Sequence, residues 1–356
     1  MTDRKLSVLL THEHYLPDMR GGGEYVVHRT ARALQARGMQ VRVLTTGDPA
    51  ITSHDGVATE RLPVSRYRLA LQSARIAEAA KDADLIQTFT YHASLPSLWA
   101  ARRLGIPVVC EVLALFGSTW QTMRGPVVGR AFQQWERFLL TRCYDRLSFL
   151  SDSSRALGLA MGADPDRSVV NAPGIDHDRL RSAETRERFV LFAGKLDARK
   201  GIHHLFAVAR ALPDIPFQAV GWSDEIDALR ASAPPNLTII NDQGSPAYVD
   251  LLSRALILLA PSYAETFGVV VAEAMASGCA VVSSIDTLSF EGTRVAPGDE
   301  PAMIAAVSHL WADPEGTTAI GRRNCQAASA FTWDAHIDRL TELYRTVLPE
   351  PRILTP

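Results

Sequence analysis

The stretch ALILLAPSYAETFGVVVAEAMASGCAVVSS, residues 255–284, decides the fold. It holds an apolar run at 255–260, a short polar loop, a run rich in small apolar residues, and another apolar run at 279–284. Short apolar runs without alternation are typical of strands that are covered on both faces. We therefore expect a strand, a helix beginning near Phe267 and a second strand, which together make a parallel sheet with a right-handed crossover.

The same alternation of strands and helices covers the rest of the chain. In the first half, helix-like segments at 24–37, 67–81 and 127–142 separate runs that predict strands at 5–11, 41–46, 84–89, 107–113 and 146–150. The pattern later starts again, with strands predicted at 189–194, 217–221, 237–240, 255–260 and 279–284. Helices are expected between them, beginning near Gly201, Asp224, Pro246 and Phe267.

With 356 residues, of which 47% are hydrophobic, the chain is longer than one core usually organises. We expect two doubly wound α/β domains, residues 1–175 and 176–330, because the strand pattern stops and restarts between residues 172 and 187. After the last predicted strand, residues 331–350 are expected to form a helix that packs back toward the first domain.

Charge and cysteine content narrow the class of protein. The 37 Lys and Arg residues are balanced by 39 Asp and Glu residues, so the broad basic surface of a nucleic-acid binder is not expected. No C-x-x-C pair occurs, and reduced core cysteines are expected at Cys110, Cys143, Cys279 and Cys325. No charged-then-apolar leader opens the chain, and no apolar run approaches the ~20 residues that span a bilayer. We expect a cytoplasmic protein that binds small molecules.

Three consecutive glycines, residues 21–23, stand between the first predicted strand and the first helix. Ligands of open parallel sheets bind beyond the carboxyl ends of the strands. There, Gly22 and Gly23 would let the backbone approach a ligand, while the free helix amides attract an anion. A flexible loop is the simpler interpretation. A Rossmann dinucleotide site fits poorly, because its first glycine should follow the strand directly and no acid for the ribose is evident near LTTGD.

A second loop, FAGKLDARKG at residues 192–201, gathers three cations after a strand: Lys195, Arg199 and Lys200. Gly201 opens the following helix. Cations beside a helix N-terminus suit a diphosphate, whose closely spaced charges need neutralising. The alternative is a solvated basic loop.

Two glutamates interrupt the apolar stretch at 255–284. We expect Glu265 to project from the loop ahead of the helix, which Thr266 would cap, and Glu273 to lie two turns inside that helix. Glutamates are rarely buried unless they are paired or hydrogen-bonded, and a carboxylate accepts hydrogen bonds from the hydroxyls of a sugar. The alternative is structural, with one glutamate at a helix N-terminus and the other exposed.

These motifs together carry a family resemblance. Glu265, seven residues and Glu273, within PSYAETFGVVVAEAMASGCAVV, resemble the E-x7-E signature of retaining glycosyltransferases, in particular glycosyltransferase family 4. GKLDARKG is similar to that family's G-R-L-x-x-x-K-G, and GGGEYVVHRTARALQARGMQVRVLTT to its amino-terminal glycine loop and first helix. The resemblance covers nearly the whole chain. It implies a GT-B fold, in which two Rossmann-like domains face each other across a cleft, the first holding the acceptor and the second a nucleotide-sugar.

The resemblance also implies a role for each residue. Lys195, Lys200 and Glu265 would be catalytic, the lysines on the diphosphate and Glu265 on the hydroxyls of the donor sugar. Glu273 would hold the ribose. Further donor contacts would come from Gly22, Gly23, Arg199, Phe267, Gly268 and Val269. No metal and no cofactor besides the nucleotide-diphosphate sugar is implied, and the sugar would be transferred with retention by same-face attack.

The chain departs from the family pattern in three places. Leu113 stands about where many members have a histidine. Lys195 replaces the usual arginine and loses its planar fork. The segment 283–299 is shorter than the corresponding loop of family members. Acceptor-side residues are expected at His92 and Glu111, and base-binding residues at Trp222, Gln243 and Gly244.

The acceptor stays open at this point. Residues 120–146 combine aromatic side chains with arginines, which fits a helix resting on the inner face of a membrane and a lipid-linked acceptor, but also an ordinary crossover helix and a soluble acceptor. The predicted function is therefore sugar transfer from a nucleotide-sugar to a hydroxyl acceptor. Two alternatives remain: a nucleotide-sugar epimerase on the same fold, and a non-catalytic nucleotide-sugar binding protein.

Overall fold

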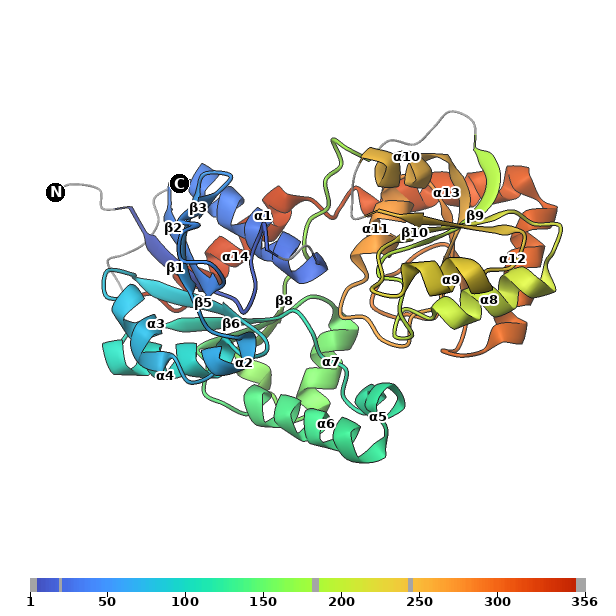
Figure 1. Cartoon of the computed structure of the whole chain (residues 1–356). Coiled ribbons are helices and arrows are strands. Elements are labelled where there is room, and N and C mark those ends of the chain that lie inside the picture. The colour runs from blue at the N-terminus through green and yellow to red at the C-terminus, as the bar shows by residue number, and fades with distance from the viewer. Residues whose placement is uncertain (1–4, 19–20, 181–185, 243–245, 350–356) are drawn as a thin grey trace. The chain divides into compact units, whose positions relative to one another are not determined.

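The computed structural model describes residues 5–18, 21–180, 186–242 and 246–349. Its contacts divide the chain into two compact units. The first comprises Met1–Trp120, Pro126–Gly174 and Trp333–Pro356, and the second Gln121–Gly125 and Ile175–Thr332. Each unit has its own sheet, largely or wholly parallel, with helices on both faces (Figure 1). The predicted α/β class with two parallel sheets is confirmed.

In the described part of the first unit, eight strands form one sheet in the order β3-β4-β2-β1-β5-β6-β7-β8, parallel except for the hairpin β3–β4. The five predicted strands are confirmed: β1 Ser7–Thr11, β2 Gln40–Thr46, β5 Leu85–Phe89, β6 Val108–Val112 and β7 Arg146–Phe149. Three further strands were not predicted: β3 Ser53–His54, β4 Val57–Leu62 and β8 Ser168–Val170. Two of them are too short to form an apolar run, and the apolar residues of β4 are interrupted by Thr59, Glu60 and Arg61.

The helices predicted in the first unit are found, one of them divided, and three helices that were not predicted lie at Ser94–Leu104, Thr119–Arg124 and Asp152–Ala160. The segment predicted as a single helix at 67–81 forms two short helices, α2 Arg66–Leu69 and α3 Ser73–Ala79. The other helices are α1 Gly22–Ala36, α4 Ser94–Leu104, α5 Thr119–Arg124, α6 Pro126–Leu140, α7 Asp152–Ala160 and α14 Trp333–Arg345.

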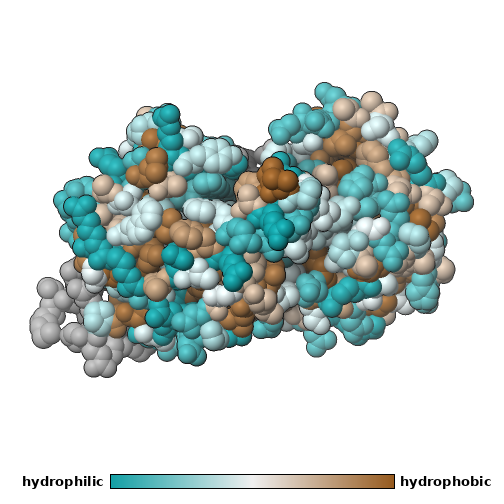
Figure 2. All heavy atoms as spheres, turned by 90° about the horizontal axis from the view of Figure 1, so that it is seen from below, coloured by the Kyte–Doolittle hydropathy of each residue, from teal (hydrophilic) through white to brown (hydrophobic). Residues whose placement is uncertain are grey.

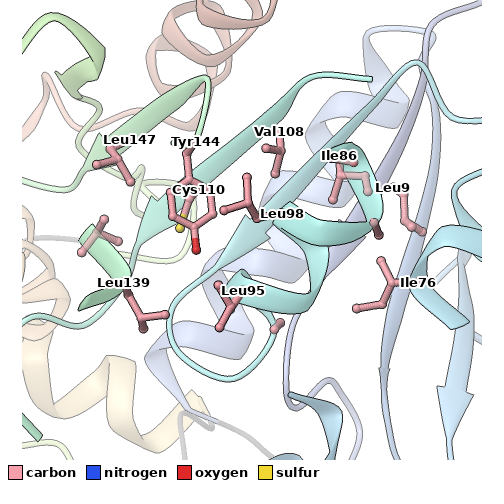
Figure 3. Close-up of a cluster of buried hydrophobic side chains, with 14 of the residues drawn as sticks. Leu9, Ile76, Ile86, Leu95, Leu98, Val108, Cys110, Leu139, Tyr144 and Leu147 are labelled. Carbon is pink, nitrogen blue, oxygen red and sulfur yellow. The ribbon is translucent and has the colours of Figure 1, made fainter. Parts of the chain in front are cut away.

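Buried side chains pack against both faces of this sheet. On one face, Ile76 of α3 and residues of α4 contact apolar side chains of the strands, as Figure 3 shows for Leu9, Ile86, Leu95, Leu98 and Val108. On the other face, α1 and α14 contribute Val27, Leu34, Ile337, Leu340 and Tyr344. The last helix of the chain is thus part of the first unit's core.

In the described part of the second unit, six parallel strands have the order β11-β10-β9-β12-β13-β14. Five match the predicted runs: β9 Glu187–Ala193, β10 Phe217–Gly221, β11 Leu237–Asn241, β12 Ala255–Ala260 and β13 Ala280–Ser283. The short β14 Gly292–Arg294 was not predicted. The helices are α8 Ile202–Ala211, α9 Ile226–Ser232, α10 Pro246–Arg254, α11 Val269–Ala276, α12 Glu300–Ala312 and α13 Pro314–Ala328.

Two further observations bear on the sequence analysis. The four cysteines form no disulfide, but Cys143 is exposed, so the expectation that all four are core residues is wrong for it. Among the described residues, no helix combines the length and the apolar character needed to cross a bilayer.

Candidate functional site

The candidate site lies at the carboxyl ends of β9 and β12 in the second unit. These strands are parallel neighbours at the centre of the sheet, so the loops that follow them lie side by side. One loop, residues 194–201, carries the three cations, and the other, residues 261–268, carries Glu265. The backbone N–H of Tyr263 donates to the carbonyl of Arg199 at 2.9 Å and ties the two loops together.

The Glu265 carboxylate is the centre of the charge cluster. The Lys200 ammonium donates a hydrogen bond to its Oε1, and Arg199 Nη1 lies 3.8 Å from the same oxygen. Burial raises the pKa of the Glu265 carboxyl, but the charges of Lys200 and Arg199 outweigh this effect and leave the pKa below its usual value. Glu265 is therefore ionised at neutral pH, and the two predicted catalytic residues Lys200 and Glu265 are in direct contact.

Lys195 has a different environment. Its Nζ lies 4.4 Å from the centre of the Trp222 ring and 3.8 Å from Asp197 Oδ2. A cation over an indole face is attracted by the ring quadrupole. The structure thus brings Trp222, which was assigned to base recognition, next to a lysine assigned to the diphosphate. Asp197, which was not singled out, also accepts from the Lys200 backbone N–H at 3.0 Å and fixes the turn between the lysines.

Gly201 allows the two loops to approach this closely. It has a left-handed backbone with φ +79°, and a Cβ at this position would lie 2.2 Å from the carbonyl oxygen of Pro261. Only glycine fits such a position without moving the backbone. The backbone N–H of Ile202, the first residue of α8, donates to the carbonyl of Asp197 at 3.3 Å.

The start of α11 corrects one prediction. The N-cap residue is Gly268, with φ +90°, and no side chain caps the helix, so Thr266 is not the cap. The helix begins at Val269, which places Glu273 about one turn inside it rather than two. Thr287 Oγ1 donates to the carbonyl of Phe267 at 2.5 Å and fixes this loop. A pocket at the site is lined by Lys200, Ser262, Glu265, Gly268, Val270 and Ile285, among others.

Glu273 occupies a separate environment on α11. Its Oε2 accepts a hydrogen bond from Tyr248 Oη at 2.6 Å. Burial raises the pKa of the Glu273 carboxyl to about 7, against the effect of this hydrogen bond. Tyr248 lies 25 residues earlier in the chain, on α10, and nothing in the spacing of the sequence pointed to this pair. The base-binding candidates Gln243 and Gly244 lie outside the described residues.

Two family models match this chain. The model described as Glycosyl transferase 4-like domain matches residues 21–174, and that described as Glycosyl transferases group 1 matches residues 187–313. Together the two models cover most of the sequence. The first matches residues of the first unit and the second matches residues of the second unit. The chain is a glycosyltransferase of the family 4 type.

Named relatives are similar over nearly the whole chain. The D-inositol 3-phosphate glycosyltransferase of Mycobacteroides abscessus is 24% identical, covering 98% of this chain and 90% of the relative. The phosphatidyl-myo-inositol mannosyltransferase of Mycobacterium leprae is 27% identical, covering 94% and 95%. The expected enzyme class is thereby confirmed, and the epimerase and non-catalytic alternatives lose their support.

Solved structures establish the fold of this glycosyltransferase. Sucrose-phosphate synthase from Thermosynechococcus elongatus has a TM-score of 0.83 at 21% identity, covering 96% of this chain and 99% of that chain. HepE from Anabaena, determined in complex with UDP-glucose, has a TM-score of 0.79 at 17% identity, covering 96% and 100%. The predicted GT-B class is confirmed by these likenesses.

The glycine loop of this glycosyltransferase lies in the first unit. Gly22 and Gly23 are the first residues of α1. A Cβ on Gly23 would lie 3.6 Å from Leu113 Cδ1 and 4.0 Å from His12 Nε2. Leu113, the residue about where many family members have a histidine, therefore lies beside the glycine loop, and His12, which the sequence analysis did not consider, is its neighbour there.

His92 and Glu111, the two expected acceptor-side residues, have very different surroundings. His92 Nδ1 lies 2.5 Å from Oε2 of Glu13, a residue the sequence analysis missed in the loop after β1. Burial raises the pKa of the Glu13 carboxyl. The hydrogen bond from His92 and the charge of its ring outweigh this effect and lower the pKa to about 2. Glu111 lies within β6 and is completely buried, with its Oε2 accepting from Gln87 at 2.9 Å. The structure thus places Glu111 in the core of the unit.

Proposed function

We propose that this glycosyltransferase moves a sugar from a nucleotide-diphosphate donor to a hydroxyl acceptor, with retention and with protein cations in place of a metal. The observation that carries the proposal is the contact of Lys200 and Arg199 with the ionised Glu265 at the carboxyl ends of β9 and β12. One set of side chains there offers both cations for a diphosphate and a carboxylate for sugar hydroxyls.

The chemistry follows from the charge that develops. When the bond between the anomeric carbon and the phosphate oxygen breaks, its electron pair stays on the diphosphate. Lys195 and Lys200 would stabilise this charge. The acceptor oxygen bonds to the anomeric carbon on the face that the phosphate leaves, and its proton passes to the leaving phosphate oxygen. No side chain acts as a nucleophile in this scheme.

The remaining residues would bind the donor. Glu265 would accept hydrogen bonds from sugar hydroxyls, Glu273 from the ribose, and Trp222 would contact the base. Arg199 and the amides near Phe267, Gly268 and Val269 would add diphosphate contacts. Gly22 and Gly23 remain donor-binding candidates in the first unit. Complexes of HepE with UDP-glucose support a uridine donor as the first to test.

The test is a panel of UDP-, GDP-, ADP- and dTDP-sugars, each added with and without Mg²⁺ and EDTA. We expect one base to raise the melting temperature, and donor hydrolysis or transfer to proceed equally in EDTA. The anomeric configuration of the product, determined by NMR, should match that of the donor. If no nucleotide-sugar of the panel stabilises the protein, the donor assignment is contradicted. Loss of turnover in EDTA would contradict the metal-independent scheme. A product of inverted configuration would contradict transfer with retention.

A second proposal concerns where the enzyme works. The helix α6 exposes Val127, Val128, Phe132 and Phe138. Arg130 and Arg137 are exposed beside them, whereas Glu136, the acid of this helix, is buried. Figure 2 views the molecule from below the orientation of Figure 1. On this face, hydrophobic residues are interspersed with hydrophilic ones. Apolar and basic side chains on one helix suit an anionic membrane surface, so we propose peripheral contact of a cytoplasmic enzyme with the membrane through α6.

Vesicle sedimentation tests this second proposal. We expect binding to phosphatidylglycerol-containing vesicles and none to pure phosphatidylcholine, with the Val127→Glu variant losing most of the binding. Leu71 is a matched control, because it is equally exposed, at 79% against 81% for Val127, but is not part of α6. Equal binding of the Val127→Glu and Leu71→Glu variants would refute a role for α6.

A further inference from the structure

The first unit holds a cluster of two histidines and an aspartate that includes none of the glycine-loop residues. His28 lies on α1, His54 is the last residue of β3, and Asp55 follows it in the hairpin turn. One ligand atom from each residue, an imidazole nitrogen or a carboxylate oxygen, can be chosen so that all three lie within 4.8 Å of one another. The cluster therefore brings together the side chains that transition metals prefer, from two separate elements.

The spacing of these atoms fits a bound ion better than hydrogen bonds. His28 Nε2 lies 3.6 Å and His54 Nε2 3.5 Å from Asp55 Oδ2. Hydrogen bonds between nitrogen and oxygen are usually about 2.7–3.2 Å long. Ligands bound at about 2.0–2.1 Å around a tetrahedral Zn²⁺ are about 3.3 Å apart. The distances from Asp55 Oδ2 to the two histidine nitrogens are close to this separation of ligands around Zn²⁺.

The second ring nitrogen of His28 has its own partner. Its Nδ1 lies 2.8 Å from the hydroxyl of Tyr15, which is completely buried. When Nδ1 carries the proton and donates to the phenol oxygen, the lone pair of Nε2 is free on the side of Asp55. Hydrogen bonds of this kind orient histidines that bind metals.

The hairpin turn is also held in place on α1. Arg32 Nη1 donates to the carbonyl of Asp55, and Gln35 Nε2 donates to that of Gly56 at 3.3 Å. Asp55 is 62% and His54 24% exposed at the side chain, so water can supply a fourth ligand. The three protein ligands thus need little rearrangement to close around an ion.

We propose that His28, His54 and Asp55 form a binding site for a divalent transition-metal ion of the Zn²⁺ type, which links the β3–β4 hairpin to α1. The site uses imidazole nitrogens and one carboxylate, a set that suits Zn²⁺, Co²⁺ or Ni²⁺ and disfavours Mg²⁺ and Ca²⁺. It is separate from the sugar-transfer site and does not depend on the function proposed above.

The experiment is calorimetric titration of the untagged, chelator-treated full chain with Zn²⁺, Co²⁺ and Mg²⁺. We expect one Zn²⁺ and one Co²⁺ per chain, a Co²⁺ absorption spectrum of tetrahedral type, and no binding of Mg²⁺. The variants His54→Ala and Asp55→Asn should bind at least tenfold more weakly. Asparagine tolerates the left-handed backbone of residue 55, where φ is +46°, so the turn is retained.

His309 provides the matched control, because it is an exposed histidine on α12 of the second unit. The His309→Ala variant should bind Zn²⁺ as the unmodified protein does. Circular dichroism of each variant separates loss of the site from loss of the fold. The proposal is overturned if the unmodified protein binds no Zn²⁺, or if well-folded His54→Ala and Asp55→Asn variants bind it unchanged.

Discussion

The Lys200 ammonium and the Glu265 carboxylate form an ion pair that joins the end of the β9–α8 loop to the loop ahead of α11. Their side chains are only 17% and 14% exposed. The stability of such a largely buried ion pair depends on good geometry as well as on the attraction of the charges. We infer that each residue neutralises the other until the donor enters, when the diphosphate and the sugar hydroxyls become their new partners.

Replacing Lys200 by alanine tests this inference. In the proposed mechanism, the variant lacks a cation that would act mainly as charge builds on the leaving diphosphate, so we expect turnover to fall by about 10²–10³-fold. Arg199 still lies 3.8 Å from Glu265, so the carboxylate keeps a positive neighbour and the fold should survive. Steady-state kinetics and thermal melting measure the two effects separately.

Lys81→Ala is the control for this substitution. Lys81 pairs with Glu78 on an exposed face of the first unit, where an ion pair contributes little. Its turnover and melting temperature should stay close to those of the unmodified enzyme. Unchanged turnover in the Lys200→Ala variant would contradict the diphosphate assignment.

Much of this arrangement could be predicted from the sequence. Continuous apolar runs predicted ten strands, and the residue types and spacing of Lys200 and Glu265 suggested a diphosphate and a sugar contact. Contacts between residues far apart in sequence could not be predicted. Tyr248 meets Glu273, and Trp222 meets Lys195, only because the sheet order brings their elements together. Local sequence contains no information on that order.

Burial could not be predicted from the sequence pattern either. Glu111 was expected on the acceptor side, but it is the fourth of the five residues of β6 and is completely buried. The prediction that Thr266 caps α11 was also wrong. Gly268, with its left-handed backbone, is the N-cap residue, so the helix begins at Val269.

The second prediction concerns pH and Glu273. Its pKa of about 7 lies above the unfolded value of 4.5. The folded state binds the proton of this carboxyl more tightly than the unfolded chain does. The resulting stabilisation of the fold is complete below pH 4.5 and is lost as the pH rises through about 7. In the proposed donor complex, ribose hydroxyls would donate to the ionised carboxylate, so donor affinity should rise about tenfold from pH 6 to pH 8. UDP-glucose, or the donor found in the panel, is the suitable ligand because its diphosphate does not titrate in this range.

The Glu273→Gln variant is the control for the titration. Glutamine keeps the shape of the side chain and has no charge to lose, so its donor affinity should be weaker and independent of pH between 6 and 8. A slope that persists in this variant would assign the titration to another group. Calorimetry at several pH values gives both results.

The third prediction compares two glycines with similar backbone angles. Gly201 and Gly38 have φ values of +79° and +82°, but a Cβ on Gly201 meets the backbone of Pro261, whereas nothing lies within 4 Å of one on Gly38. Gly38→Ala should cost about 1 kcal/mol from the backbone alone. Gly201→Ala should cost about 2 kcal/mol more, because the loop that carries Glu265 must move. It should also lower turnover, which Gly38→Ala should not. Urea unfolding and kinetics on both variants check this, and equal losses would remove the close approach as the reason for Gly201.

The fourth prediction concerns Glu136, a buried carboxylate of α6 that holds the segment after β6. It accepts hydrogen bonds from the Tyr91 hydroxyl at 2.7 Å, the Trp120 indole at 2.8 Å, and the amides of Phe116 and Gly117 at 3.0 and 2.8 Å. The Glu136→Ala variant leaves these donors without their acceptor, so we expect a loss of about 3–5 kcal/mol in the unfolding free energy.

Hydrogen exchange locates this loss in the chain. The Phe116 and Gly117 amides should exchange much faster in the Glu136→Ala variant, because their acceptor is gone, while amides of the second unit should keep their rates. Glu136→Gln should lie between the two proteins, since its carbonyl oxygen still accepts but its NH₂ group faces the donors. Glu78→Ala, at an exposed site on α3, should change neither exchange nor stability noticeably. Unchanged exchange at residues 116 and 117 would mean that other contacts, and not Glu136, hold the segment after β6.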